Sequence, residues 1–70
     1  MTKRSVTIAE VAIYRAANLL IQQHGVDAEW EACRRVDAMR SRGDHYGQRL
    51  WVEIRRAVLG LQTWQKAPPP

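Results

Sequence analysis

The chain has 70 residues, of which 46% are hydrophobic, and its 11 basic and 7 acidic side chains give a formal net charge of +4. This length is enough for one small domain, which buries only about 60% of the surface that its unfolded chain exposes. The hydrophobic content is too high for a fully disordered chain, and no apolar run approaches the ~20 residues of a membrane-spanning helix.

The first predicted helix covers residues 8–24. The stretch 7–10 has the form of a capping box, in which the Thr7 hydroxyl accepts from the backbone N–H of Glu10. Gly25 supplies the left-handed conformation that often closes a helix. The apolar side chains recur at helical spacing and are expected to form one broad buried face: Ala9, Ala12, Ile13, Ala16, Leu19 and Leu20.

The second predicted helix covers residues 28–42, with Asp27 as its N-cap and Gly43 just beyond its end. Glu31 and Arg35 are four residues apart on the polar side of this helix, so we expect them to form an ion pair. The apolar stripe consists mainly of small side chains, which permit close approach of a neighbouring helix: Ala28, Ala32, Val36 and Met39.

The third predicted helix covers residues 45–65 and is the longest, with Asp44 as its N-cap. Residues 66–70 end in three prolines that cannot continue a helix, so this tail and residues 1–6 are expected to be flexible. The predicted buried face of the helix includes two residues at its edge, Tyr46 and Trp64, and a central set: Gly47, Leu50, Trp51, Ile54, Ala57, Val58 and Leu61.

These patterns together predict an all-α fold. No segment shows the alternation of apolar and polar residues that is typical of a strand. The two connections have about two to four residues, which favours antiparallel neighbours. We therefore expect a single domain over residues 1–70, a small three-helix bundle in which the second and third helices form a hairpin and the first packs across them.

Few side chains are suited to catalysis or metal binding. His24, Cys33 and His45 match no zinc-ligand spacing, and one cysteine excludes an internal disulfide. The carboxylates have arginines or cap roles nearby, and no glycine-rich phosphate loop is present. We predict no enzymatic activity, no metal, no cofactor and no small-molecule substrate. Because no apolar signal-peptide core follows the N-terminus, we expect a cytoplasmic protein.

Several apolar side chains fall outside the predicted buried faces. Trp30 lies about 120° from the centre of its helix's apolar stripe, and Val52 and Leu59 lie opposite the core of the third helix. Contiguous exposed apolar patches mark binding surfaces, where tryptophan and arginine concentrate the binding energy. We therefore predict a surface for a protein partner or for self-association, made of Trp30, Val52, Leu59, Arg55, Val11 and Tyr14.

Two other interpretations of these side chains stay open. Trp30 is equally well placed to cover the connection to the first helix. Val52 and Leu59 are also placed to contact the first helix, if that helix packs on their side. In either case the side chains belong to the protomer's own core and not to a binding surface.

Nucleic-acid binding is the alternative function, because the chain is basic. The basic residues alternate with acidic ones, however, and the predicted hairpin lacks the Ala-then-Gly spacing of a helix-turn-helix. A dedicated surface would leave several cations unpaired on one face. The best candidates for contacts to phosphate are Lys3, Arg4, Arg49, Arg55 and Arg56.

Two segments carry a resemblance to known proteins. Residues 43–57 follow the cadence G-D-x-x-G-x-x-x-W-x-x-I-x-x-A, and residues 16–25 read A-A-N-L-L-I-Q-Q-H-G. From about Val6 to Leu61 the chain resembles a family of short, uncharacterised proteobacterial proteins, which implies the fold and the compartment but no activity. The predicted hairpin is also loosely similar to one tetratricopeptide repeat, but its small and aromatic positions are shifted, which argues against a peptide groove of that type.

Overall fold

Residues 7–66 are described by a computed structural model, and every regular element in this range is helical. The elements are α1 (Ile8–His24), a 3-10 turn η1 (Gly25–Asp27), α2 (Ala28–Ser41) and α3 (His45–Lys66). This confirms the all-α prediction. The predicted bounds are wrong by one residue at two ends, because Arg42 is the C-cap of α2 and Lys66 belongs to α3 and not to the tail. Residues 1–6 and 67–70, predicted to be flexible, lie outside the described residues.

Polar side chains cap two of the three α-helices as predicted. The Thr7 hydroxyl oxygen accepts from the backbone N–H of Glu10 at 3.1 Å, and an Asp44 carboxylate oxygen accepts from the N–H of Gly47 at 2.8 Å. Asp27 occupies the predicted N-cap position of α2, but its side chain makes no cap hydrogen bond. The turn η1 leads directly into α2 and leaves Asp27 at φ −90° and ψ 4°, far from the extended backbone of an N-cap.

Two glycines reverse the chain direction between the α-helices. Gly25 has φ 58° and Gly43 has φ 71°, backbone angles that residues with a Cβ rarely adopt. The N–H of Gly25 donates to the carbonyl of Ile21, and the N–H of Gly43 donates to the carbonyl of Arg40 at 3.0 Å. Both connections are therefore short and fixed by backbone hydrogen bonds.

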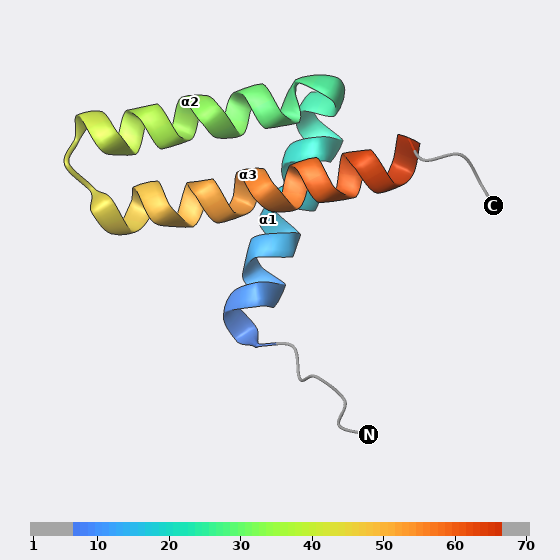
Figure 1. Cartoon of the computed structure of the whole chain (residues 1–70), viewed down its shortest axis with the longest axis horizontal. Helices are drawn as coiled ribbons and strands as arrows, with labels where there is room; N and C mark the ends of the chain where they lie inside the picture. Colours follow the sequence, from blue (N-terminus) through green and yellow to red (C-terminus); the bar gives the residue numbers. More distant parts are fainter. Residues whose placement is uncertain (1–6, 67–70) are drawn as a thin grey trace.

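The α-helices form two layers (Figure 1). Helices α2 and α3 run side by side in opposite directions, and α1 passes behind α3 at a steep angle. The shortest dimension is 15 Å, which matches two layers of helices with axes ~8–10 Å apart. Helix α1 lies against one face of the hairpin, where Ile13, Ala16 and Ile21 pack against the core, and its first turn extends beyond α3. One face of the α2–α3 hairpin is consequently left uncovered by α1.

The buried core is small. Val58 is the largest fully buried side chain, and four of the eight buried hydrophobic residues are alanines. Small side chains let the helices approach closely, but they remove little apolar surface from water. Among the described residues, the buried hydrophobic ones are Ala17, Leu20, Ala28, Ala32, Val36, Ile54, Ala57 and Val58.

The predicted buried face of α1 is partly wrong. Ala9, Ala12 and Leu19 are exposed, with Leu19 at 52%, whereas Leu20 is buried and Ile13 and Ala16 pack against the core as predicted. The physical reason is the crossing geometry, because α1 contacts the hairpin along a line through Ile13, Ala17 and Leu20. Helical periodicity identifies apolar side chains but does not show where a crossing helix contacts them.

Candidate interaction surfaces

The uncovered face of the hairpin contains most of the predicted partner-binding residues. On α3, Val52, Arg55 and Leu59 follow one another at intervals of three and four residues and so form one stripe. A shallow depression of about 350 Å³ beside this stripe is lined only by residues of α2 and α3: Cys33, Val36, Asp37, Arg40, Val52 and Arg55. We call the surface made of Trp30, Cys33, Val52, Arg55 and Leu59 the outer face.

Trp30 is the most exposed member of the outer face. Its side chain is 64% exposed, so it does not serve mainly to cover the connection to α1. The guanidinium carbon of Arg34 lies 5.2 Å from the centroid of its ring, within the range of a cation–π contact. The indole is thus held by its own helix and still presents most of its surface.

Val52 and Leu59 are less exposed than the sequence predicts. Both are half-buried, and for Val52 the reason is the close approach of α2 and α3, which brings α2 side chains such as Cys33 up to the flank of α3. The depression beside Val52 has no lining residue from α1. The alternative that α1 covers Val52 therefore has no support, and Val52 lies at the seam between α2 and α3.

An ion pair crosses the outer face from one helix to the other. Arg55 donates to the carboxylate of Glu29 at 3.0 Å, and both side chains are partly exposed. The hydrogen bond to Glu29 raises the pKa of Arg55 above its ordinary value, and the neighbouring Cys33 adds to this effect. The outer face therefore has a fixed guanidinium at its centre, with its charge locally balanced.

The remaining two predicted residues lie elsewhere. Val11 and Tyr14 are exposed on the N-terminal half of α1, in the other helix layer. The structure therefore separates them from Trp30, Val52, Leu59 and Arg55 because α1 packs behind the hairpin. The sequence contains no signal for this separation, since it depends on which side of the hairpin α1 occupies.

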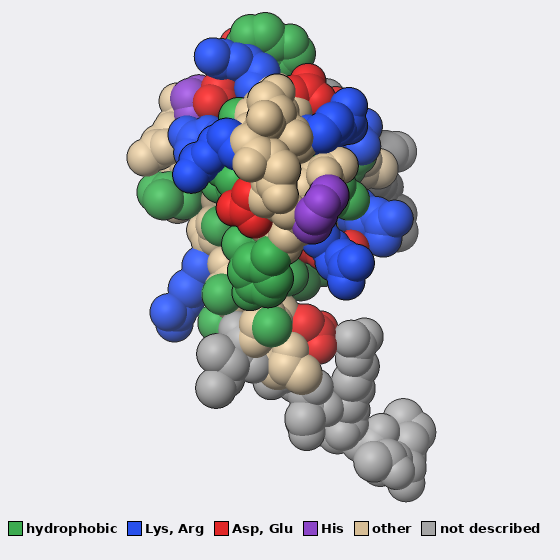
Figure 2. Space-filling model, turned by 90° about the vertical axis from the view of Figure 1, so that its left-hand side faces the viewer, with side chains coloured by type: hydrophobic (Ala, Val, Ile, Leu, Met, Phe, Trp, Pro, Cys, Tyr) green, Lys and Arg blue, Asp and Glu red, His purple; other side chains and the backbone are tan. Residues whose placement is uncertain are grey.

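Tyr14 takes part in a second apolar surface, which we call the corner, between α1 and the first turns of α3. One hollow is lined by Glu10, Ile13, Tyr14, Glu53, Arg56 and Ala57, and an adjoining one by Tyr46, Arg49, Leu50 and Glu53. Figure 2 shows hydrophobic atoms gathered below the turn between α2 and α3, toward α1. Leu50 is exposed, so its predicted place in the buried face is wrong, and Tyr46, predicted at the edge of that face, is 80% exposed. The crossing α1 does not reach the first turns of α3.

The predicted nucleic-acid residues do not form one set of free cations. Arg55 pairs with Glu29, and Arg56 lies 3.4 Å from Glu53. Arg49 makes no ion pair with another described residue and lines the corner. Lys3 and Arg4 lie outside the described residues.

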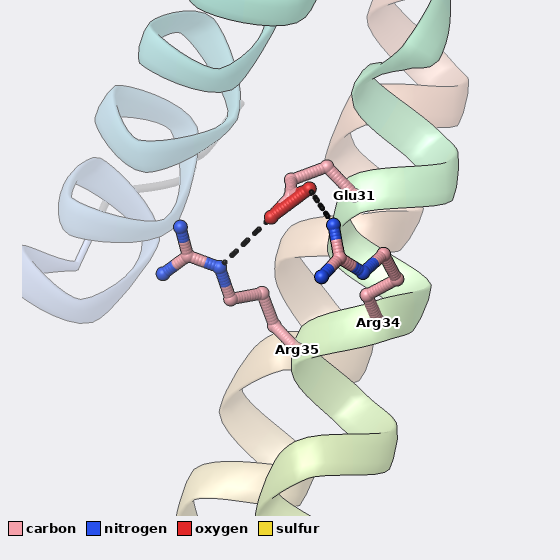
Figure 3. A network of polar contacts seen from close by, with 3 residues as sticks. All are labelled: Glu31, Arg34 and Arg35. Atoms are coloured by element: carbon pink, nitrogen blue, oxygen red, sulfur yellow. Dashed lines mark hydrogen bonds and ion pairs between the residues drawn. The ribbon is translucent and has the colours of Figure 1, made fainter.

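On the side of the hairpin toward α1, a polar network covers part of the core (Figure 3). Glu31 accepts from Arg34 and from Arg35, at 3.3 Å in each case, which confirms the predicted pair of Glu31 and Arg35. The guanidinium carbon of Arg35 lies 5.1 Å from the centroid of the Trp51 ring. Through the contact of Arg35 with Trp51, this network ties α2 to α3.

Neither the described residues nor comparisons with known proteins indicate a metal site, a membrane-spanning helix or a known family. Within residues 7–66, no three histidine, cysteine or acidic side chains come together as a metal site. In the same range, no helix has the length and apolar character needed to cross a membrane. No family model, curated protein or solved structure matches the chain. The resemblance to short proteobacterial proteins thus stays a prediction.

Proposed function

We propose that this chain is a small non-catalytic interaction module, folded as a three-helix bundle, that binds protein through its outer face. One observation carries the proposal. Trp30 is 64% exposed, and it lies one turn of α2 before Cys33, which lines the depression on the hairpin face that α1 leaves uncovered. Half-buried Val52 and Leu59 and the paired Arg55 lie on the same face.

The residue types on the outer face suit protein binding. A tryptophan contributes a large apolar area at a small cost in conformational entropy, and arginine stacks and donates hydrogen bonds from a planar group. Trp30 and Arg55 are thus of the types that dominate binding energy in protein interfaces. Val52 and Leu59 supply apolar surface that a partner removes from water.

The small core supports the same proposal. A protomer with an alanine-rich core gains little from its own burial, so covering a further apolar face stabilises it. Nucleic-acid binding has less support, because Arg55 and Arg56 are both paired with carboxylates. The cytoplasmic location stays a prediction that rests on the sequence.

The test is affinity capture from a nuclease-treated extract of the cells that produce the chain. Wild type and Leu59→Asp serve as baits, with Leu19→Asp as the matched control, since Leu19 is an exposed leucine on α1. We expect a protein that wild type and Leu19→Asp retain and that Leu59→Asp loses. The proposal fails if no captured protein depends on the outer face, or if a parallel capture without nuclease retains only nucleic acid that moderate salt releases.

A further inference from the structure

We infer that the occupant of the outer face is a second copy of this chain, so that two α2–α3 hairpins pack face to face as a four-helix core with α1 outside each. This inference rests on the proposed function and specifies its partner. The two-layer structure supplies the geometry. The side of the hairpin that lacks α1 is the side on which a third layer of helices can add.

The charge on the outer face fits a copy of the same chain. Glu29 pairs with Arg55, and Arg40 lies 3.8 Å from Asp37 at the rim of the depression, so each positive charge on this face has a negative neighbour. In a two-fold arrangement the same patch meets itself, and patches of mixed sign can place arginine against glutamate. The chain's net charge of +4 therefore does not oppose association here.

A partner selected by charge would contact a different part of the surface. A strongly acidic partner is expected to use cations that lack an ion pair with other described residues. These are Arg15 on α1, Arg42 at the turn and Arg49 at the corner. None of the three belongs to the outer face, so an acidic protein is a poorer fit to this surface than a second copy.

The size of the face is sufficient for a dimer. Two adjacent helices form a surface roughly 20 Å wide and, over the length of α2, roughly 20 Å long. Side-chain relief and the longer α3 increase the accessible area, so two facing copies approach the ~1,200 Å² at which specific interfaces begin. A second copy is also present at the concentration of the chain itself, as a permanent stabilising partner must be.

The experiment measures the mass of the purified full chain by sedimentation velocity at low micromolar and near-millimolar concentrations. The outer-face variants are Trp30→Ala, which removes an exposed ring and leaves the core intact, and Leu59→Asp. The matched control is Leu50→Asp, which places the same charge on α3 at the corner. Circular dichroism verifies the helical content of each variant.

We expect a wild-type dimer that dissociates on dilution, at least tenfold weaker association of Trp30→Ala and Leu59→Asp, and little change for Leu50→Asp. A monomer at the highest concentration overturns the inference, as does a dimer that Leu50→Asp weakens as much as Trp30→Ala does. If the purified chain is monomeric while Leu59-dependent capture from the extract succeeds, only the second copy is excluded and the proposed function stands. If both experiments fail, both proposals fall.

Discussion

Arg55 of α3 and Glu29 of α2 are joined by an ion pair, with Nη2 of the arginine 3.0 Å from Oε2 of the glutamate. The two residues are 26 positions apart in the sequence. The other four ion pairs described, such as that of Glu53 and Arg56, join residues three or four apart on one helix. The Glu29–Arg55 pair therefore joins α2 to α3 and contributes to how far the two helices are shifted along one another.

Exchanging these two charges tests that role. We expect Glu29→Arg and Arg55→Glu each to lower the free energy of unfolding, because each places like charges together, and the double variant to recover most of the loss. Urea unfolding of wild type, the two single variants and the double variant gives the coupling free energy between the two charges. Equal losses that simply add in the double variant would show that the pair does not hold the hairpin.

The Glu29–Arg55 pair should contribute the same amount to the free energy of unfolding at neutral and at moderately alkaline pH. The hydrogen bond that Arg55 donates to Glu29 raises the pKa of the Arg55 guanidinium. A group whose pKa is raised on folding contributes its full stabilisation below its unfolded pKa and loses it only above its folded pKa. Both values lie in the strongly alkaline range, so the difference in unfolding free energy between wild type and Glu29→Gln should not change from pH 7 to 10. A difference that shrinks in this range would contradict the assignment.

The two aspartates that precede α2 and α3 should differ in importance. Asp44→Ala should cost about 1 kcal/mol, because it removes the acceptor for the N–H of Gly47. Asp27→Ala is the matched control and should change stability by less than about 0.5 kcal/mol, since Asp27 makes no cap hydrogen bond. Thermal unfolding of both variants is the measurement, and equal losses would contradict the cap assignment.

Two glycines of α3 should respond oppositely to alanine. A Cβ at Gly60 meets nothing within 4 Å, so Gly60→Ala should stabilise the chain by about 0.5–1 kcal/mol through helix propensity. A Cβ at Gly47 lies 2.7 Å from an Asp44 carboxylate oxygen and 2.8 Å from the sulfur of Met39. Gly47→Ala should therefore displace both the cap and Met39, and these losses should outweigh the gain in helix propensity, so that the chain is destabilised. Denaturant midpoints compare the pair, and a stabilising Gly47→Ala would show that Asp44 and Met39 move freely.

Truncating a side chain should lower the free energy of unfolding strongly at the centre of the core and very little on the exposed side of α1. Ile54 is 3% exposed, so Ile54→Ala should cost about 2–5 kcal/mol. Leu19 also belongs to an apolar pattern but is exposed, so Leu19→Ala should change stability by less than about 0.5 kcal/mol. Urea unfolding distinguishes them, and a loss at Leu19 similar to that at Ile54 would place α1 in another orientation.

Part of the outer face could be predicted from the sequence, and the corner could not. Trp30 was identifiable because its distance from the apolar stripe is a property of α2 alone. Tyr46 and Leu50 carry no such signal, since they lie on the same side of α3 as Ala57. Whether that side is covered depends on where α1 crosses. Predicting that the exposed Tyr14 and Tyr46 both lie at the corner requires the same information.

The sequence by itself determined where each α-helix begins and ends, to within one residue, because these limits depend on local backbone chemistry. The Thr7 and Asp44 caps and the positive φ of Gly25 and Gly43 act within four residues of their own positions. Only the tertiary structure decided which apolar side chains are buried and which hairpin face stays open. Those outcomes depend on contacts between helices distant in the sequence, for which periodicity gives a direction but no partner.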